Sequence, residues 1–215
     1  MSAARGRFIT LEGGEGTGKS TQAKRLAAHL EAGGHRVVVT REPGGSAGAE
    51  AVRHVILSGA AKPFGAGAEA LLFAAARADH VDSLIKPSLL AGLWVVCDRF
   101  IDSTKVYQGV LGDVDGDLLS GLERVAVGET RPDLTVILDV PPEVGLARAA
   151  ARGAVADRFE QEGLAFHTRV REAFLALATA DPGRCVVVDA GGTPDEVAAR
   201  IWAVVVERFQ LFVAA

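Results

Sequence analysis

Five short apolar runs, separated by helical patterns, constrain the fold of this chain more than any other feature. The runs are rich in valine, isoleucine and leucine, and they lie at residues 8–11, 36–40, 93–97, 134–139 and 185–189. The helical patterns lie at residues 18–32, 47–58, 67–91, 115–127, 142–152, 161–180 and 194–210. Nearly continuous apolar strands that alternate with helices are typical of a parallel sheet buried on both faces. The sequence therefore predicts an α/β fold, three layers (α/β/α) around a five-stranded parallel sheet.

Length and composition limit the class of protein. At 215 residues, with 49% hydrophobic and 23% charged residues, the chain has an ordinary balance for one soluble domain with a substantial core. Its net charge of -4 argues against a protein that grips nucleic acid through a large basic surface. No apolar stretch is long enough for a signal peptide or a membrane span, and Cys97 and Cys185 lie in or beside apolar runs, as buried thiols do in a reducing compartment. We expect a single cytoplasmic domain over residues 1–215 that binds neither a membrane nor nucleic acid.

The residues between the first apolar run and the first helical pattern fit G-x-x-x-x-G-K-[ST], the phosphate-binding P-loop. The glycines let backbone N–H groups turn toward phosphate oxygens, while Lys19 can reach the outer phosphates and the Ser20 hydroxyl can bind Mg²⁺. The alternative is a glycine turn that happens to carry Lys-Ser, but the strand before it and the helix after it favour phosphate binding. The residues predicted to contact a nucleoside triphosphate here are Gly13, Gly14, Glu15, Gly16, Thr17, Gly18, Lys19, Ser20 and Thr21.

Other polar residues follow the second and third apolar runs, where ligands of an open α/β sheet bind. Asp98 is placed to hold Mg²⁺ in a P-loop protein, and Arg99 offers a planar fork that suits a phosphate. The alternative is that Asp98 caps the next helix and Arg99 pairs with it. The segment 40–46 (TREPGGS) is a turn by its own chemistry, and its Arg-Glu pair suggests that the turn faces a ligand.

Two further groups of side chains allow a functional and an ordinary interpretation. Phe73 and Arg77 are spaced i, i+4, so one helix face could present both to a nucleobase, or they could be a core ring and a solvated arginine. Tyr107 is likewise either a core residue or a contact. Arginines in the polar segment 148–160, a candidate mobile lid, could stabilise a transferring phosphoryl group or lie on a solvated helix face. They are Arg148, Arg152 and Arg158.

The segment 67–86 is rich in alanine and apolar almost all round its circumference. Such a helix is either fully buried or half buried against another subunit. We expect a mixture of core and dimer contact.

Taken together, these segments resemble the thymidylate kinase family, bacterial type, of the P-loop nucleoside monophosphate kinases. The resemblance rests on motifs in the family's order and spacing across nearly the whole chain. They are EGGEGTGKST around the P-loop, TREPGG at 40–45, LLFAAARADH at 71–80, VCDRFIDSTKVYQ at 96–108, RPDLTVILDV at 131–140 and DRFEQE at 157–162. The P-loop alone is generic, but the set is highly specific.

The resemblance implies transfer of the γ-phosphoryl group of ATP to dTMP with Mg²⁺, usually by a homodimer. By the same resemblance Lys19 binds the ATP phosphates, Ser20 and Asp98 serve the metal, and Arg99 holds the dTMP phosphate. It gives Glu15 a contact with the acceptor sugar. On the acceptor side it implies that Phe73 stacks on thymine and that Arg77 reads a thymine carbonyl. Ser103 and Thr104 would border the base, and Tyr107 would lie beneath the deoxyribose. Glu42 and Pro43 would shape the pocket.

The variable residues of the P-loop contain no arginine, so the bacterial type is implied, in which lid arginines supply that charge. Arg152 and Arg158 match these positions, whereas Ala150 stands where relatives often carry another arginine, so the sequence leaves open which arginine acts in the transition state. Arg148 and the loop after Asp189 are candidates for binding the adenine, which the sequence leaves open. Lys105 has no explanation from the sequence.

Two other functions stay open on the residues alone. One is a related kinase for dUMP, dCMP or a nucleoside. Phe73, Arg77 and Thr104 discriminate between the alternatives, because a site that reads thymine need not accommodate an amino group at the pyrimidine 4-position. The other is a P-loop module that binds nucleotide without catalysis, and the presence of Lys19, Ser20, Asp98 and the arginines argues against it.

Overall fold

Five parallel strands form the central sheet, as the apolar runs predict. The computed structural model describes residues 5–152, 159 and 161–211. The strands are paired in the order β2-β3-β1-β4-β5, so the first strand lies at the centre. Their bounds are β1 Phe8–Glu12, β2 Val37–Arg41, β3 Trp94–Asp98, β4 Leu134–Asp139 and β5 Cys185–Asp189.

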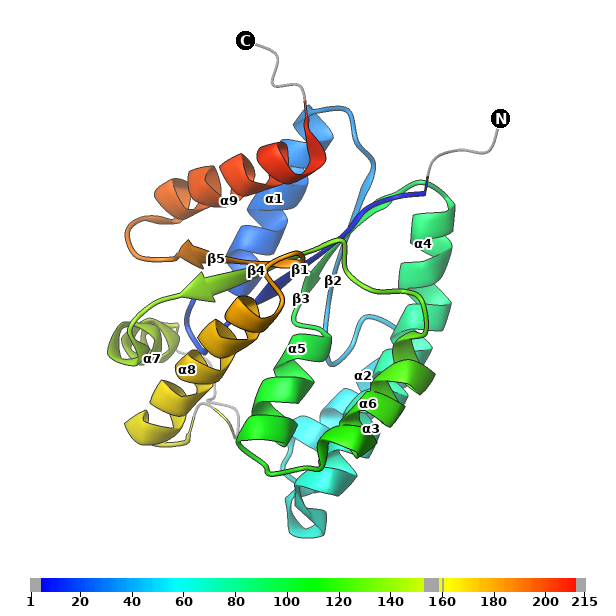
Figure 1. Ribbon diagram of the computed structural model, residues 1–215, viewed down its shortest axis with the longest axis vertical. Coiled ribbons are helices and arrows are strands. Elements are labelled where there is room, and N and C mark those ends of the chain that lie inside the picture. Colours follow the sequence, from blue (N-terminus) through cyan, green and yellow to red (C-terminus); the bar gives the residue numbers. More distant parts are fainter. Residues whose placement is uncertain (1–4, 153–158, 160, 212–215) are drawn as a thin grey trace.

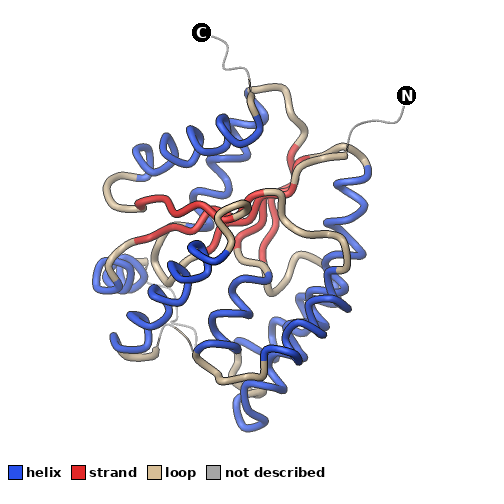
Figure 2. Tube along the Cα trace, in the orientation of Figure 1, coloured by secondary structure: helices blue, strands red, loops and turns tan. Residues whose placement is uncertain are grey.

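Helices connect the strands and cover both faces of the sheet (Figures 1 and 2). The α-helices are α1 Lys19–Ala32, α2 Ala47–Leu57, α3 Gly65–His80, α4 Lys86–Leu90, α5 Ile101–Thr104, α6 Gly116–Val127, α7 Pro142–Ala151, α8 Leu164–Ala180 and α9 Pro194–Phe209. Among the described residues, three short segments have other helical geometries, namely the 3₁₀ helix η1 Lys62–Phe64 and the π-helices η2 Val81–Ile85 and η3 Lys105–Val110.

The core has one part on each face of the sheet because successive strand residues point to opposite sides. On one face, α1 and α9 pack on Ile9, Leu11 and Val136. On the other face, Phe8 and Val95 pack against α3, η2 and α4, while Ile137 packs against η3 and α8. The predicted three-layer α/β/α fold is therefore confirmed.

The helix boundaries differ from the sequence prediction in two places. The single helix expected over 67–91 contains the π-helix η2 between α3 and α4. The helical stretch formed by α5 and η3 was not among the predicted patterns. Its sequence, IDSTKVYQGV, combines β-branched residues and glycine, which lower helix propensity, so burial of Val106 and Tyr107 has to supply the missing stability.

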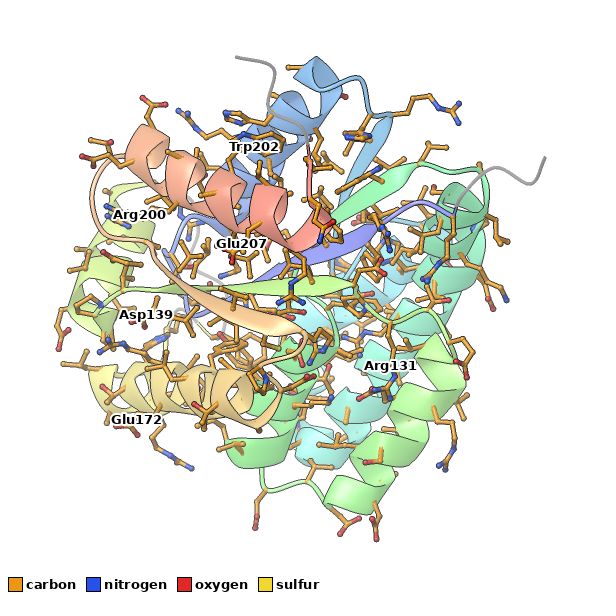
Figure 3. All side chains as sticks on the ribbon, turned by 45° about the horizontal axis from the view of Figure 1, so that its top comes forward. Arg131, Asp139, Glu172, Arg200, Trp202 and Glu207 are labelled. Carbon is orange, nitrogen blue, oxygen red and sulfur yellow. The ribbon has the colours of Figure 1, made fainter. Side chains whose placement is uncertain are left out.

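The outer faces of the helices carry charged side chains, such as Arg200 and Glu207 on α9 and Glu172 on α8 (Figure 3). Within the described part of the chain, no helix combines the length and the apolar character needed to cross a membrane.

Candidate active site

The carboxyl ends of the strands open into a pocket of about 590 Å³, the position at which open α/β sheets bind ligands. The P-loop lines one part of the pocket, and residues from α3, α5 and η3 line another. Nearly all of the predicted site residues meet here. They are Glu15, Gly16, Thr17, Gly18, Lys19, Ser20, Thr21, Glu42, Pro43, Phe73, Arg77, Asp98, Arg99, Ser103, Thr104, Tyr107, Arg148 and Arg152.

Three predicted residues are not part of this lining. Gly13 and Gly14 lie in the P-loop beside a separate small cavity, which is also lined by His167 and Phe174 of α8. Arg158 lies outside the described residues, as does most of the segment predicted to be a lid.

Two glycines are required by the path of the P-loop. Gly13 has a φ of 132°, and a Cβ there would lie 2.4 Å from the carbonyl oxygen of Leu138. Gly16 has a φ of 67°, and its Cβ would lie 1.8 Å from the carbonyl oxygen of Gly145 on α7. A side chain at either position would force the loop away from β4 or α7, so the loop conformation depends on glycine.

The Lys19 side chain folds back over the P-loop. Its Nζ donates hydrogen bonds to the carbonyl oxygens of Gly13 and Gly14, at 3.0 and 2.6 Å. Burial, followed by the nearby charge of Arg99, lowers the pKa of Lys19 to about 8, although Glu15 and Asp98 act in the opposite direction. The amine is thus held against the carbonyl oxygens of its own loop, in a side chain that also lines the pocket.

Oxygen ligands suited to a magnesium ion face each other beside the P-loop. The Ser20 hydroxyl, at the start of α1, donates a hydrogen bond to Oδ2 of Asp98, at the end of β3. Hydroxyl and carboxylate oxygens are the ligand types that Mg²⁺ prefers, and it is usually bound by one or two carboxylates together with substrate phosphates. This donor set fits the metal that the motif predicts.

Arg99 connects the P-loop to the acceptor side of the pocket. Its Nη1 donates to the Gly13 carbonyl and the Ser103 hydroxyl, and its Nη2 lies 2.5 Å from Oε1 of Glu15. The Tyr107 hydroxyl donates to the same carboxylate oxygen at 3.1 Å. Burial alone would raise the pKa of Glu15, but the charges of Arg99 and Lys19 and these hydrogen bonds lower it to about 2.

Arg77 is buried, which excludes the interpretation of a solvated arginine. Its Nε donates to Oε2 of Glu42 at 2.7 Å, and its Nη2 donates to the Phe100 carbonyl and the Thr104 hydroxyl, both at 3.1 Å. Phe73, one helical turn earlier on α3, is half-buried and also lines the pocket. The i, i+4 spacing therefore does bring both side chains to one cavity.

Tyr107 and Arg148 also have defined surroundings. The Tyr107 ring packs among Phe159, Phe166 and Phe174, so it is a core residue whose hydroxyl reaches the site. Arg148 of α7 donates to the carbonyl oxygens of Ala190 and Gly192, in the loop after β5. Arg148 thus lies against this loop, and adenine binding there stays a prediction.

Sequence reasoning missed two buried residues beside the pocket. Glu12 accepts hydrogen bonds from the Phe100 amide and from the amide and hydroxyl of Ser103. Burial, with a smaller contribution from Asp102, raises the pKa of Glu12 to about 7. Its place as the last residue of an apolar run before the P-loop is a signal that could have identified it. His80 is the second residue, and its i+3 spacing from Arg77 is the corresponding signal.

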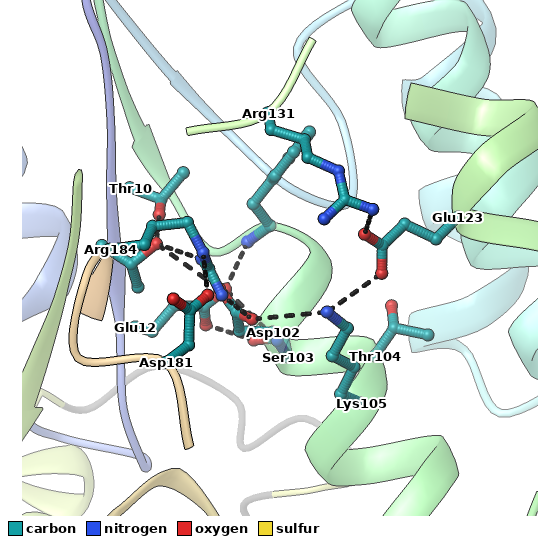
Figure 4. Close-up of polar contacts among 12 residues, drawn as sticks. Thr10, Glu12, Asp102, Ser103, Thr104, Lys105, Glu123, Arg131, Asp181 and Arg184 are labelled. Atoms are coloured by element: carbon teal, nitrogen blue, oxygen red, sulfur yellow. Dashed lines mark hydrogen bonds and ion pairs between the residues drawn. The ribbon is translucent and has the colours of Figure 1, made fainter. Parts of the chain in front are cut away.

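Lys105 also acquires an explanation. Its Nζ lies 3.0 Å from Oε2 of Glu123 on α6 and 4.0 Å from Oδ1 of the buried Asp102 (Figure 4). It therefore links η3 to α6 and points away from any predicted ligand contact.

A P-loop lysine and serine, a strand-end aspartate and an arginine-lined acceptor side around one pocket define a P-loop kinase of the nucleoside monophosphate kinase type. The thymidylate kinase family model matches residues 11–201. The chain belongs to the thymidylate kinase family and is thus a phosphotransferase.

Individual relatives agree with this assignment. The chain is 61% identical over 206 residues to the thymidylate kinase of Nitrobacter winogradskyi, covering 95% of this chain and 90% of that protein. It is 56% identical over 209 residues to the thymidylate kinase of Bradyrhizobium diazoefficiens, covering 96% and 92%. The crystal structure of thymidylate kinase from Ehrlichia chaffeensis superposes with a TM-score of 0.76 at 33% identity, covering 94% of this chain and 99% of that one.

Proposed function

We propose that this member of the thymidylate kinase family transfers the γ-phosphoryl group of ATP to dTMP inside the central pocket. The observation that carries the proposal is that one cavity is lined both by the P-loop residues Lys19 and Ser20 and by Phe73 and Arg77. Donor and acceptor bound on these two sides would lie close together, and phosphoryl transfer depends chiefly on such positioning and on charge stabilisation.

On the donor side, the amides of the P-loop and Lys19 hold the phosphates of ATP. Lys19 has to leave the carbonyl oxygens of Gly13 and Gly14 to reach them. Ser20 and Asp98 would hold Mg²⁺, which when bound neutralises charge on the phosphate oxygens. Arg148 and the loop after β5 form the adenine side.

On the acceptor side, Arg99 holds the phosphate of dTMP, and Glu15 and Tyr107 contact its sugar. Phe73 stacks on the base, Arg77 donates to a base carbonyl, and Thr104 and Ser103 border the ring. Glu42 and Pro43 complete the wall. The hydrogen bonds among Arg99, Glu15 and Tyr107, and between Arg77 and Glu42, support these roles because they orient the polar groups before a ligand binds.

Arg152 lines the pocket and is the described arginine that we assign to stabilising charge on the transferring group. The resemblance implies the same role for Arg158, which lies outside the described residues.

We also propose a homodimer that forms through α2, α3 and α6, which lie together on one side of the molecule (Figure 1). Large apolar side chains are exposed on each of these helices, as on surfaces that associate. They are Val55, Leu71, Leu118 and Val125.

Both cysteines are buried free thiols, which supports the expected cytoplasmic location.

A coupled assay of ADP release tests the acceptor. With ATP and Mg²⁺ held constant, dTMP should support the fastest turnover among dTMP, dUMP, dCMP, the ribose form of TMP and thymidine. An amino group at the pyrimidine 4-position would face the donor Arg77, so dCMP should be a poor acceptor. Strong activity with another acceptor and none with dTMP would refute the proposed substrate.

A further inference from the structure

His80 is a fully buried side chain beside the pocket for which the proposed reaction has no role. It is the last residue of α3, and both of its ring nitrogens have partners. Nδ1 lies 3.0 Å from Oε1 of Glu42, and Nε2 lies 2.7 Å from the hydroxyl of Thr40. Because a carboxylate only accepts hydrogen bonds, Nδ1 carries a proton and donates it to Glu42.

Glu42 is shared between His80 and Arg77. One carboxylate oxygen accepts from His80, and the other accepts from Nε of Arg77 at 2.7 Å. Arg77 is held a second time by its Nη2, which donates to Phe100 and Thr104. Nη1 is left without a hydrogen bond among the described residues, in a side chain that lines the pocket. The guanidinium is thus fixed from two sides, with one terminal nitrogen available to a ligand.

The imidazole also packs against the turn that follows β2. A Cβ on Gly45, whose φ is 89°, would lie 2.4 Å from both Nε2 of His80 and the hydroxyl of Thr40. His80 therefore holds Thr40 of β2, and Glu42 and Gly45 of the loop after β2, against the end of α3. Glu42 can orient Arg77 only while this loop keeps its position relative to α3.

We propose that His80 is a positioning residue of the acceptor pocket: through Glu42 it fixes the guanidinium of Arg77 in the orientation that binds the base of dTMP. This inference rests on the proposed function, since it takes Arg77 as the group that reads a base carbonyl. Without His80, Oε1 of Glu42 loses its donor in a buried site, and the carboxylate is free to turn away from Arg77.

The test is steady-state kinetics of the purified enzyme with His80→Phe, which keeps a ring but removes both hydrogen bonds, and His80→Asn, which keeps a donor near Nδ1. His29→Phe on the exposed part of α1 is the matched control for replacing a histidine by phenylalanine. We expect His80→Phe to raise the KM for dTMP about tenfold or more, with a change in the KM for ATP of less than about twofold. His80→Asn should recover part of the loss, and His29→Phe should behave as the wild type does.

A double-mutant cycle with Arg77→Met separates positioning from general support of the fold. In the Arg77→Met background, His80→Phe should cause no further rise in the KM for dTMP. An equal rise with and without Arg77, or an unchanged KM in the single variant, overturns the inference. If His80→Phe does not fold, His80→Asn replaces it in the cycle. A rise in the KM for dTMP that disappears in the Arg77→Met background supports the inference, and an equal rise in both backgrounds overturns it.

Turnover of dTMP by the wild type distinguishes failure of this inference from failure of the proposed function. An inactive wild type refutes the function and the inference together. An active wild type combined with an unchanged KM in the His80 variants refutes the inference alone.

Discussion

Arg99 adopts a backbone conformation that few residues other than glycine occupy, with a φ of 69°. Two hydrogen bonds to β1 hold it there: the Arg99 amide donates to the Leu11 carbonyl at 2.9 Å, and the Phe100 amide donates to the Glu12 carboxylate at 2.7 Å. Unfavourable backbone conformations persist where the surrounding contacts determine them, often at functional sites. The conformation thus places the guanidinium between the P-loop and Ser103, where an acceptor phosphate is expected.

The pKa of Glu15 predicts a dependence of stability on pH. Since the folded-state pKa is about 2 against an ordinary value of 4.5, ionised Glu15 stabilises the folded state above about pH 4.5, and this contribution is lost as the pH falls toward 2. Between pH 6 and pH 3 the loss should be about 2 kcal/mol. Urea unfolding of the wild type and Glu15→Gln at both pH values measures it. If the free energies of unfolding of the wild type and Glu15→Gln differed by the same amount at pH 6 and pH 3, the result would contradict the assigned ion pair between Glu15 and Arg99.

Some site residues could be predicted from the sequence because their chemistry is local. The P-loop motif and the spacing of Phe73 and Arg77 each lie within one segment. The burial of Arg77 could not be predicted, because it depends on Glu42 arriving from the loop after β2, 35 positions away in the chain. Glu12 and His80 were missed for the same reason, since a carboxylate or an imidazole shows its role only through partners from other elements.

At the scale of elements, α5 and η3 are held in place by charged contacts along their far side. Asp102 is fully buried and accepts from both terminal nitrogens of Arg184, at 2.6 and 2.9 Å, while Lys105 approaches it from the exposed side (Figure 4). Arg184 directly precedes β5, so its ion pair with Asp102 links α5 to the edge strand of the sheet. A buried carboxylate that loses its bidentate cation is costly, whereas an exposed ion pair contributes little.

Two substitutions of this cluster should therefore differ in their effect on stability. Arg184→Met leaves Asp102 without its bidentate partner and should lower the free energy of unfolding by about 3–5 kcal/mol. Lys105→Met removes a half-exposed cation and should cost less than about 1 kcal/mol. Urea denaturation at neutral pH gives both values, and similar losses in the two variants would contradict the ranking.

The strands were more predictable than this helical stretch. Each strand is an apolar run buried on both faces, so its own composition identifies it. The α5–η3 stretch has weak local propensity and depends on Tyr107, Val106 and Asp102 being buried by α8 and β5, which no local pattern reveals.

At the scale of the whole molecule, the alanine-rich α3 contributes to the core, as its composition predicts, and the dimer contact expected for it stays a prediction. Ala70, Ala74 and Ala76 are buried, while Leu71 is 52% exposed on the side proposed to meet a second copy of the chain. The exposed apolar side chains on α2, α3 and α6 are the reason for placing the proposed dimer interface on these helices.

Leu71→Glu should therefore convert a dimer into a monomer of 22.3 kDa. Leu90→Glu on α4, which replaces an equally large exposed side chain outside the proposed interface, is the control and should leave the mass unchanged. Light scattering after size-exclusion chromatography measures both. A monomeric wild type, or a Leu71→Glu variant that stays dimeric, argues against this interface.

The proposed function requires that one pocket hold donor and acceptor for direct transfer between them. The most direct measurement follows the label from γ-³²P-labelled ATP with dTMP present and identifies the labelled product. Direct transfer predicts label on dTDP in a one-to-one ratio with ADP, with almost none in inorganic phosphate, because a bound acceptor phosphate occupies the position from which water would attack. Label found mainly in inorganic phosphate, or absent from dTDP while ADP is formed, would contradict it.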